Sequence, residues 1–231
     1  MTMHTRLFTA ILLTSLAGAE ARAQSTQIID QGSFTIMLNG QRAGREEFRI
    51  EATPGVGGTE IVARATVVFG DRRLSPALRA DSAGAPSEYQ IESRGTTSGV
   101  ERWSGKITRG RVSARINSAR GESAKEYIVT DGAIIIDDDV FHQYYFVAAN
   151  AQKTSIAIVI PRRNTQMLVK VAAAGSEQVT VGTTEIDARH LVITEPSGAT
   201  REVWVDARGR VLKVAIPSRN VVAQRDDPPA R

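Results

Sequence analysis

Few side chains in this sequence have the types and spacing that chemistry requires. Two histidines follow the N-terminal segment, His142 and His190, and neither has a second metal ligand at a suitable spacing nearby. Histidine is the usual group for proton transfer near neutral pH, so the catalytic set to consider is His190 with Asp187 or Glu185 of the same strand. Neighbouring strand positions point in different directions, which favours a packed histidine. The sequence therefore predicts no catalytic residue and a protein that is not an enzyme.

Acidic residues gather at Asp137-Asp138-Asp139. Calcium could use this cluster with backbone carbonyls, but it needs about six to eight oxygen ligands, and the segment lacks the glycine and distal glutamate of a calcium loop. Capping of a following helix is the favoured interpretation. Glu46-Glu47 is not a working carboxylate pair, because adjacent strand residues point to opposite sides. We predict no metal and no cofactor.

The composition excludes several further classes of protein. The absence of cysteine excludes disulfide scaffolds, thiol nucleophiles, zinc-thiolate sites and iron–sulfur clusters. The formal net charge is only +4, basic residues are spread evenly, and aromatic residues make up 5% of the chain, so no nucleic-acid partner is predicted. No nucleophile elbow Gly-x-Ser-x-Gly, zinc motif His-Glu-x-x-His or phosphate-binding glycine loop occurs.

The N-terminal segment has the features of a cleaved signal peptide. Arg6 supplies a positive charge, an apolar stretch runs from Leu7 to Ala17, and Ala21-Arg22-Ala23 places small residues at the two positions that a signal peptidase reads. The stretch is about half the roughly 20 residues needed to span a bilayer, and no later segment approaches that length. We expect removal of residues 1–23 and a periplasmic or secreted protein without a transmembrane segment.

The elements that must position any site are strands. Phe34, Ile36 and Leu38 share one face, and Asn39-Gly40 supplies the turn of a first hairpin. A last hairpin joins residues 201–206 to 210–216, with Gly209 at a turn position that requires a positive φ. Between them a strand and a turn recur about every ten residues, which is typical of an antiparallel meander.

This pattern predicts a mainly β fold in one domain, residues 24–224. A sheet of about ten strands must curl to hide its inner face, so we expect a single antiparallel curled sheet or an incomplete barrel. Residues 225–231 are charged and rich in proline and are predicted to form a flexible tail.

One segment departs from the alternation. Between Asp139 and Asn150 the apolar residues fall on one side of a helical wheel, while His142 and Gln143 fall on the solvent side. The pattern predicts one amphipathic helix, capped by Asp138 or Asp139, that covers the curled sheet as a lid or fills it as a plug. With a lid the interior is a cavity, and with a plug it is a packed core. Candidate lining residues are Phe34, Phe48, Phe69, Trp103, Phe141, Tyr144 and Tyr145, with Trp204 as a further candidate.

Three features together carry a family resemblance: the export signal, the meander interrupted by the helix at residues 137–145, and the closing hairpin at residues 202–214. They resemble exported β-rich proteins of unknown function whose architecture is similar to that of the LolA and LolB lipoprotein-localisation factors. The resemblance implies an incomplete barrel around a hydrophobic cavity that holds acyl chains. It implies no site residue, because no ligand-contacting position matches.

Two functions follow as hypotheses. The first is a non-enzymatic periplasmic binding or carrier protein for a lipid or another amphipathic ligand, because acyl chains need a dry apolar lining and few polar anchors. The alternative is a structural or protein-interaction module of the cell envelope, which would use exposed edge strands and basic surface to bind a partner.

Overall fold

The computed structural model describes residues 26–55 and 57–230, so the predicted signal peptide, residues 1–23, lies outside the described residues. One sheet of 15 strands, antiparallel except for the β9–β10 pair, makes up most of the structure. Its strand order is β8-β7-β6-β5-β4-β3-β2-β1-β15-β14-β13-β12-β11-β10-β9. The mainly β prediction is confirmed, and the number of strands is higher than the predicted ten.

Two meanders build the sheet, and short turns connect neighbouring strands within each of them, except that β9 and β10 pair in parallel and are joined by residues 136–154. The first meander contains β1 (Gln27–Leu38), β2 (Gln41–Gly55), β3 (Gly58–Phe69), β4 (Arg72–Asp81), β5 (Pro86–Gly95), β6 (Gly99–Thr108), β7 (Arg111–Ser118) and β8 (Gly121–Ile128). The second contains β9 (Ile134–Ile135), β10 (Ser155–Ile160), β11 (Thr165–Val181), β12 (Thr184–Thr194), β13 (Thr200–Val205), β14 (Val211–Ile216) and β15 (Val221–Arg225).

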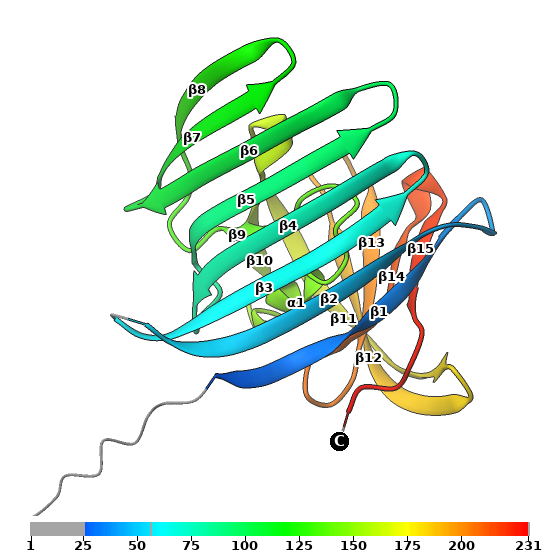
Figure 1. The fold of residues 1–231 in the computed structure, drawn as a ribbon. Coiled ribbons are helices and arrows are strands. Elements are labelled where there is room, and N and C mark those ends of the chain that lie inside the picture. Colours follow the sequence, from blue (N-terminus) through cyan, green and yellow to red (C-terminus); the bar gives the residue numbers. More distant parts are fainter. Residues whose placement is uncertain (1–25, 56, 231) are drawn as a thin grey trace, which may run out of the picture.

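The first and last strands join the two meanders. β1 pairs antiparallel with β15, with Phe34 opposite Arg225 and Leu38 opposite Val221. Figure 1 shows the first meander as a curved layer in front of the second. β8 and β9 are the two edges of the sheet, so the sheet curls without closing into a barrel.

Local sequence explains the two hairpins that were predicted most directly. Asn39 and Gly40 have φ values of 52° and 76°, which is the positive-φ pair that a tight two-residue hairpin turn requires. Gly209 has a φ of 79° in the turn between β13 and β14. Both hairpin predictions are confirmed.

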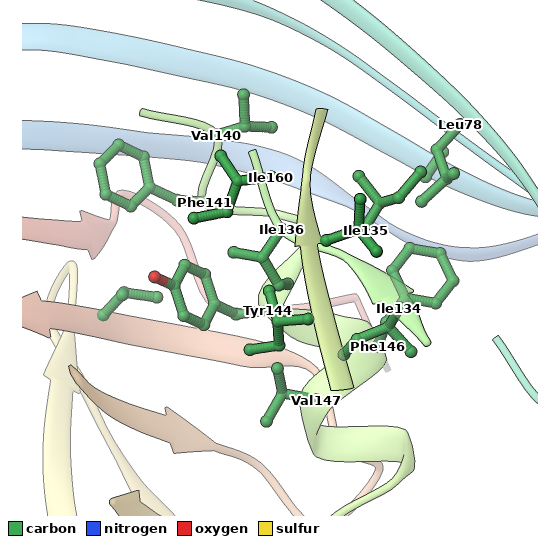
Figure 2. Packing of buried hydrophobic residues seen from close by; sticks show 14 of the residues in the cluster. Leu78, Ile134, Ile135, Ile136, Val140, Phe141, Tyr144, Phe146, Val147 and Ile160 are labelled. Atoms are coloured by element: carbon green, nitrogen blue, oxygen red, sulfur yellow. The ribbon is translucent and has the colours of Figure 1, made fainter. Parts of the chain in front are cut away.

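A segment between the meanders fills the space inside the curled sheet. We call residues 129–150 the plug segment. It contains β9 and the short helix α1 (Tyr144–Ala149), and most of its side chains are buried. Figure 2 shows Ile134, Ile136, Phe141 and Tyr144 of this segment packed together with Ile160 of β10. The plug interpretation therefore describes this structure, and the interior is packed.

Two details of the helix prediction are wrong. α1 begins at Tyr144, so His142 and Gln143 precede it, and both are buried instead of facing solvent. No side chain caps α1: Gln143 occupies the cap position, and the predicted caps lie further upstream, where Asp138 pairs with Arg163 and Asp139 pairs with Arg72 and Arg219. The helical wheel assigned these two side chains to solvent, whereas residues of the sheet surround them; Glu46 of β2, for example, lies against His142.

A second, smaller cluster lies on the other face of β13 and β14. The β11–β12 hairpin bends at a bulge beside Gly175, which has a φ of 119°, and its outer half packs over this face. The residues of this outer cluster are Val179, Val181, Ala188, Trp204 and Leu212. Trp204, a further candidate for the interior lining, therefore lies outside the interior.

The first residues of the predicted tail lie against β1. Arg225 is the last residue of β15 and is 2% exposed. Its guanidinium forms a bidentate ion pair with the carboxylate of Asp30, with nitrogen–oxygen distances of 2.8 and 2.9 Å. The carboxylate of Asp226 accepts hydrogen bonds from Ser33 and Thr35, both at 2.6 Å. Among the described residues, no helix is long and apolar enough to cross a membrane.

Candidate functional site

The plug segment is fastened to the sheet by three buried carboxylates. The first is Glu46 of β2, which is fully buried on the inner face, whereas its neighbour Glu47 faces solvent. Glu46 accepts hydrogen bonds from the backbone N–H groups of Phe141 and His142, at 2.6 and 3.0 Å. Nδ1 of His142 lies 2.5 Å from the same carboxylate. One side chain of the sheet thus holds the turn that leads into α1.

The second carboxylate is Asp137. Its side chain accepts hydrogen bonds from the hydroxyl of Tyr89 at 2.9 Å and from Nε of Arg162 at 3.0 Å. Burial raises the pKa of Asp137, and Arg162 and Tyr89 oppose that rise. Burial and the nearby Asp137 also hold the pKa of Tyr89 well above its usual value. The Tyr89 hydroxyl therefore stays protonated and donates a hydrogen bond to Asp137.

The third carboxylate is Asp139, which has a φ of 62° although it is not glycine. It bridges the two meanders, since Arg72 of β4 and Arg219 after β14 bind its two oxygens at 2.7 and 2.5 Å. A positive φ at a non-glycine residue persists only where the surroundings impose it, and these two ion pairs provide that constraint. The plug segment is therefore held by ion pairs and hydrogen bonds as well as by apolar packing.

The predicted lining residues lie in one hydrophobic core. Six of them are buried and Tyr145 is partly buried; the six are Phe34, Phe48, Phe69, Trp103, Phe141 and Tyr144. Phe34 stacks on Phe48 with ring centroids 5.0 Å apart, and the Tyr144 hydroxyl accepts a hydrogen bond from Arg201 at 3.0 Å. The strands and the plug segment meet at these aromatic rings.

A small apolar pocket remains where the two ends of the sheet approach each other, and we call it the seam pocket. Its volume is about 10 Å³, enough for a single water molecule. Strands near one edge of the sheet and the segment around the other edge both contribute to it. It is lined by Pro86, Trp103, Ile107, Val112, Tyr127, Val129, Ala133, Ile135, Val159 and Pro161.

Two hydrogen-bond donors in the lining of the seam pocket lack an acceptor. The indole Nε1 of Trp103 and the hydroxyl of Tyr127 are buried and have no hydrogen-bond partner within residues 26–55 and 57–230. Leaving a buried polar group unpaired costs about 1–3 kcal/mol. Burial raises the pKa of Tyr127, and the charge of Asp137 raises it further, so the hydroxyl is a proton donor at neutral pH.

Close packing fixes the indole of Trp103. Gly105 lies two residues further along β6, and a Cβ atom there would come within 2.4 Å of the Trp103 ring. Tyr89 packs against the other side at a centroid distance of 5.7 Å. The unpaired donor is therefore held in one orientation.

His190 lies on the outer face and not in the interior. Its ring stacks on Trp204 at 4.3 Å, and its nitrogens lie 3.4 Å from Glu177 and 3.0 Å from Glu202. Asp187, one of the two carboxylates proposed for it, is bound by Gln178. The carboxylates at His190 come from the neighbouring strands β11 and β13, as strand geometry requires. Within the part of the chain that the structure describes, no group of three or more histidine and acidic side chains could hold a metal ion.

Sequence reasoning missed the buried position of Tyr127 and the roles of Glu46 and Asp139. Tyr127 had a detectable signal, because it is the one aromatic residue of strand β8. Glu46 alternates with Phe48 and Ile50, which could have placed it on the inner face of β2. Asp139 was assigned to helix capping, and no local pattern reveals the distant partners of either carboxylate.

Known proteins resemble this chain in structure but not in sequence. No protein-family model and no curated protein sequence matches the chain. The structure is similar to a β-barrel-like protein of the domain of unknown function DUF1849 from Brucella abortus, with a TM-score of 0.52 and 8% identity over 88% of this chain and 98% of that one. A DUF1089 family protein from Pseudomonas aeruginosa matches at a TM-score of 0.41 and 16% identity, over 93% of this chain and 98% of that one. At 8% identity the likeness to the Brucella abortus protein shows a similar fold alone.

Proposed function

We propose that the protein is a non-enzymatic periplasmic binding or carrier protein for a lipid or another amphipathic ligand. The observation that carries the proposal is that the plug segment occupies the apolar interior of the sheet and is almost separate from the sheet itself. Both meanders contribute apolar side chains to one interior, and a separate segment that adds only the two residues of β9 to the sheet occupies that interior. A ligand that replaces part of the plug segment would meet a continuous apolar surface, which is what an acyl chain requires.

Polar fastening of the plug segment supports this role. Its three carboxylate contacts, at Glu46, Asp137 and Asp139, are directional and separable from the apolar packing. Such contacts can re-form after the plug segment has been displaced, so they define the position to which the segment returns when no ligand is bound. The predicted export signal and the resemblance to the LolA and LolB carriers agree with a role in the cell envelope.

Native mass spectrometry tests the function directly. The protein is purified from a periplasm without detergent, and its mass is compared before and after organic extraction. We expect an added mass that extracts as lipid, or that appears after incubation with envelope lipids. A clean ligand-free mass under both conditions would contradict the proposal and favour the alternative, an interaction module of the envelope, which is then tested by crosslinking.

A matched pair of variants locates binding in the interior. Phe69→Asp places a charge on the inner face of β3, which a ligand would contact, whereas Val68→Asp places the same charge at the adjacent outer position, where the side chain is 42% exposed. We expect Phe69→Asp to lower lipid occupancy and Val68→Asp to leave it unchanged, with circular dichroism confirming that both variants fold. Equal occupancy in a folded Phe69→Asp protein would place the ligand elsewhere.

A further inference from the structure

Two adjoining hollows lie on the outer face of the first meander, on the side of the sheet away from the plug segment. Their volumes are about 250 and 530 Å³, and both include Ser104 of β6 in their lining. The smaller is lined by Glu88, Ser104, Gly105, Lys106, Ser113 and Arg115. The polar lining residues of the larger include Arg64, Ser75, Gln90, Glu92, Arg102 and Asn117. We call the two hollows together the outer groove.

Strand register explains the direction of the outer groove. A row of cross-strand neighbours crosses β3 to β7 in the order Arg64, Ala77, Gln90, Ser104 and Arg115. Figure 1 shows these five strands side by side in the front layer. The row ends in arginines, and its middle members are short or uncharged. With strands about 4.8 Å apart the row is about 19 Å long, so the outer groove suits an extended ligand that lies across the strands.

Positive charge exceeds negative charge along the outer groove. The cationic side chains in its lining outnumber the carboxylates by four to two: Arg64, Arg102, Lys106 and Arg115 against Glu88 and Glu92. Both carboxylates are already engaged. Glu92 is bound by Arg94 and, at 2.6 Å, by Arg102, and Glu88 lies 3.7 Å from Arg79 of β4.

Three of the four cations are poorly neutralised. Arg115 lies 3.4 Å from Glu122, and Arg64 lies 3.8 Å from Glu51. Lys106 has no ion-pair partner within 4 Å among residues 26–55 and 57–230. Exposed ion pairs as long as these contribute little to stability, so the cations remain available to an anionic ligand.

The smaller hollow has the donors that an anionic group requires. Lys106 lies opposite Ser113, and Ser104 lies opposite Arg115, on the paired strands β6 and β7. The two cations therefore occupy one diagonal of the hollow and the two hydroxyls the other, with all four side chains exposed. Diagonal neighbours on a sheet are about 7–8 Å apart, so an oxyanion between them can accept hydrogen bonds from both cations.

The larger hollow indicates which kind of polyanion fits. Trp103 is the one aromatic residue in the lining of the outer groove, and it is only 2% exposed. Single-stranded nucleic acid needs exposed aromatic rings on which its bases stack, and these are missing here. Ser75, Gln90 and Asn117 instead offer uncharged donors and acceptors, which match the hydroxyl groups of a sugar.

We propose that the outer groove binds a linear acidic polysaccharide, with one of its carboxylates between Lys106 and Arg115 and its sugar hydroxyls along the larger hollow. This interaction uses the face of the sheet opposite to the apolar interior, so it goes beyond the proposed carrier function and does not depend on it. The outer groove is open in this structure, and binding requires no movement of a strand.

Isothermal titration calorimetry tests the proposal with oligogalacturonate, a linear chain with one carboxylate on each sugar. Its methyl ester, in which every carboxylate is neutralised, is the matched control ligand. We expect the acid to bind with one-to-one stoichiometry at low ionic strength and the ester to bind at least tenfold more weakly. Affinity for the acid should fall as salt is added, because the charges lie at the surface.

Single-charge variants locate the site. Lys106→Gln and Arg115→Gln should each weaken binding of the acid about fivefold, the effect of one exposed ion pair. Arg189→Gln removes the same charge from an exposed position on β12 and should leave binding unchanged. Ser104→Glu places a negative charge where the two hollows meet and should abolish binding.

Four results would overturn the proposal, and none of them affects the carrier function. The first is no binding of the acid, and the second is equal binding of the acid and its ester. The third is an equal loss of affinity in Arg189→Gln and Lys106→Gln, which would indicate non-specific attraction to a basic protein. The fourth is equal binding of polyglutamate of the same charge, which would assign the outer groove to an acidic peptide.

Discussion

At the scale of single residues, the polar groups inside the sheet determine how the plug segment sits. Glu46 is the clearest case, because its carboxylate receives two backbone N–H groups and faces a histidine ring at the same time. Replacing it by Gln turns an amide N–H₂ toward at least one of these donors. A buried donor that faces another donor is unpaired and is not reached by water.

We therefore expect Glu46→Gln to lower the free energy of unfolding by about 3 kcal/mol. Glu47→Gln, the adjacent exposed residue, should change it by less than about 0.5 kcal/mol. Urea unfolding followed by circular dichroism measures both variants. Equal midpoints for the two would mean that Glu46 does not hold the plug segment.

Asp226 links stability to pH. Partial burial by itself would raise the pKa of Asp226, but hydrogen bonds from Ser33 and Thr35, together with the charge of Arg45, hold it below its usual value. An acid with a lowered pKa in the folded state stabilises the fold above its unfolded pKa of about 4, and this contribution is lost as pH falls through the folded pKa.

Asp226→Asn should accordingly be less stable than the parent at pH 7, by about 1 kcal/mol for a partly exposed site. The difference should narrow as the pH falls below about 4, because the parent carboxyl becomes neutral as well. Asp227→Asn, which alters an exposed neighbour, is the control. A difference that stays constant between pH 7 and pH 3 would contradict this linkage.

The sequence pattern predicted apolar residues better than polar ones at this scale. Phe34, Phe48 and Phe69 are buried as expected, because period-two alternation alone identifies the inner face of a strand. His142 was assigned to the wet side of a helix and is buried, since its neighbours come from β2, nearly a hundred positions away. Long-range pairs of this kind leave no local pattern.

At the scale of elements, the β11–β12 hairpin depends on one backbone position. Gly175 lies at the bulge where the strand bends, and its φ of 119° is disfavoured for residues with a side chain. Beyond the bend the hairpin covers Trp204 and Leu212, and Gln224 of β15 donates a hydrogen bond to Thr180 near its tip.

Gly175→Val should destabilise the outer half of this hairpin by about 2 kcal/mol through backbone strain. Hydrogen exchange should then become faster in residues 176–190 and remain unchanged in β2 to β4. Gly57→Ala serves as the control, because its φ is ordinary and no atom lies within 4 Å of the added methyl group. Faster exchange throughout the sheet would show that the hairpin is not an independent unit.

Strands could be predicted where residues typical of a tight turn mark the end of one strand and the start of the next. The hairpins at Asn39-Gly40 and Gly209 follow from residues that adopt positive φ at low cost. β8 and β9 were hard to predict. β8 is exposed along nearly its whole length, so it lacks a clear alternation of buried and exposed residues, and β9 has only two residues. These two strands account for part of the difference between the predicted ten strands and the observed 15.

At the scale of the whole molecule, the pairing of β1 with β15 holds the two meanders together. Arg225 reinforces it, because its guanidinium reaches Asp30 of β1 and the backbone carbonyl of Gln31. Loss of this arginine would leave Asp30 buried without its counter-charge, which is strongly destabilising. The site depends on this joint as well, since the plug segment is anchored to both meanders.

Deletion of residues 221–231 should therefore abolish the cooperative unfolding transition, whereas deletion of residues 228–231 should lower the midpoint by only a few degrees. Thermal unfolding followed by circular dichroism distinguishes the two. A cooperative transition in the longer deletion would mean that each meander is stable without the other.

The curled antiparallel sheet was predictable from alternation and from the need of a large sheet to hide one face. The pairing of β1 with β15 was not, because hydrophobic patterns do not reveal which distant strands pair.

The pairing of β1 with β15 has a consequence for the order of folding. Apart from β9, each meander consists of hairpins between neighbouring strands, and such local contacts form early and fast. The joint between them brings together residues from opposite ends of the polypeptide, such as Phe34 and Arg225. It cannot form until the last strand has been synthesised, so a growing chain carries two unjoined half-sheets and completes its interior in a late, slower step.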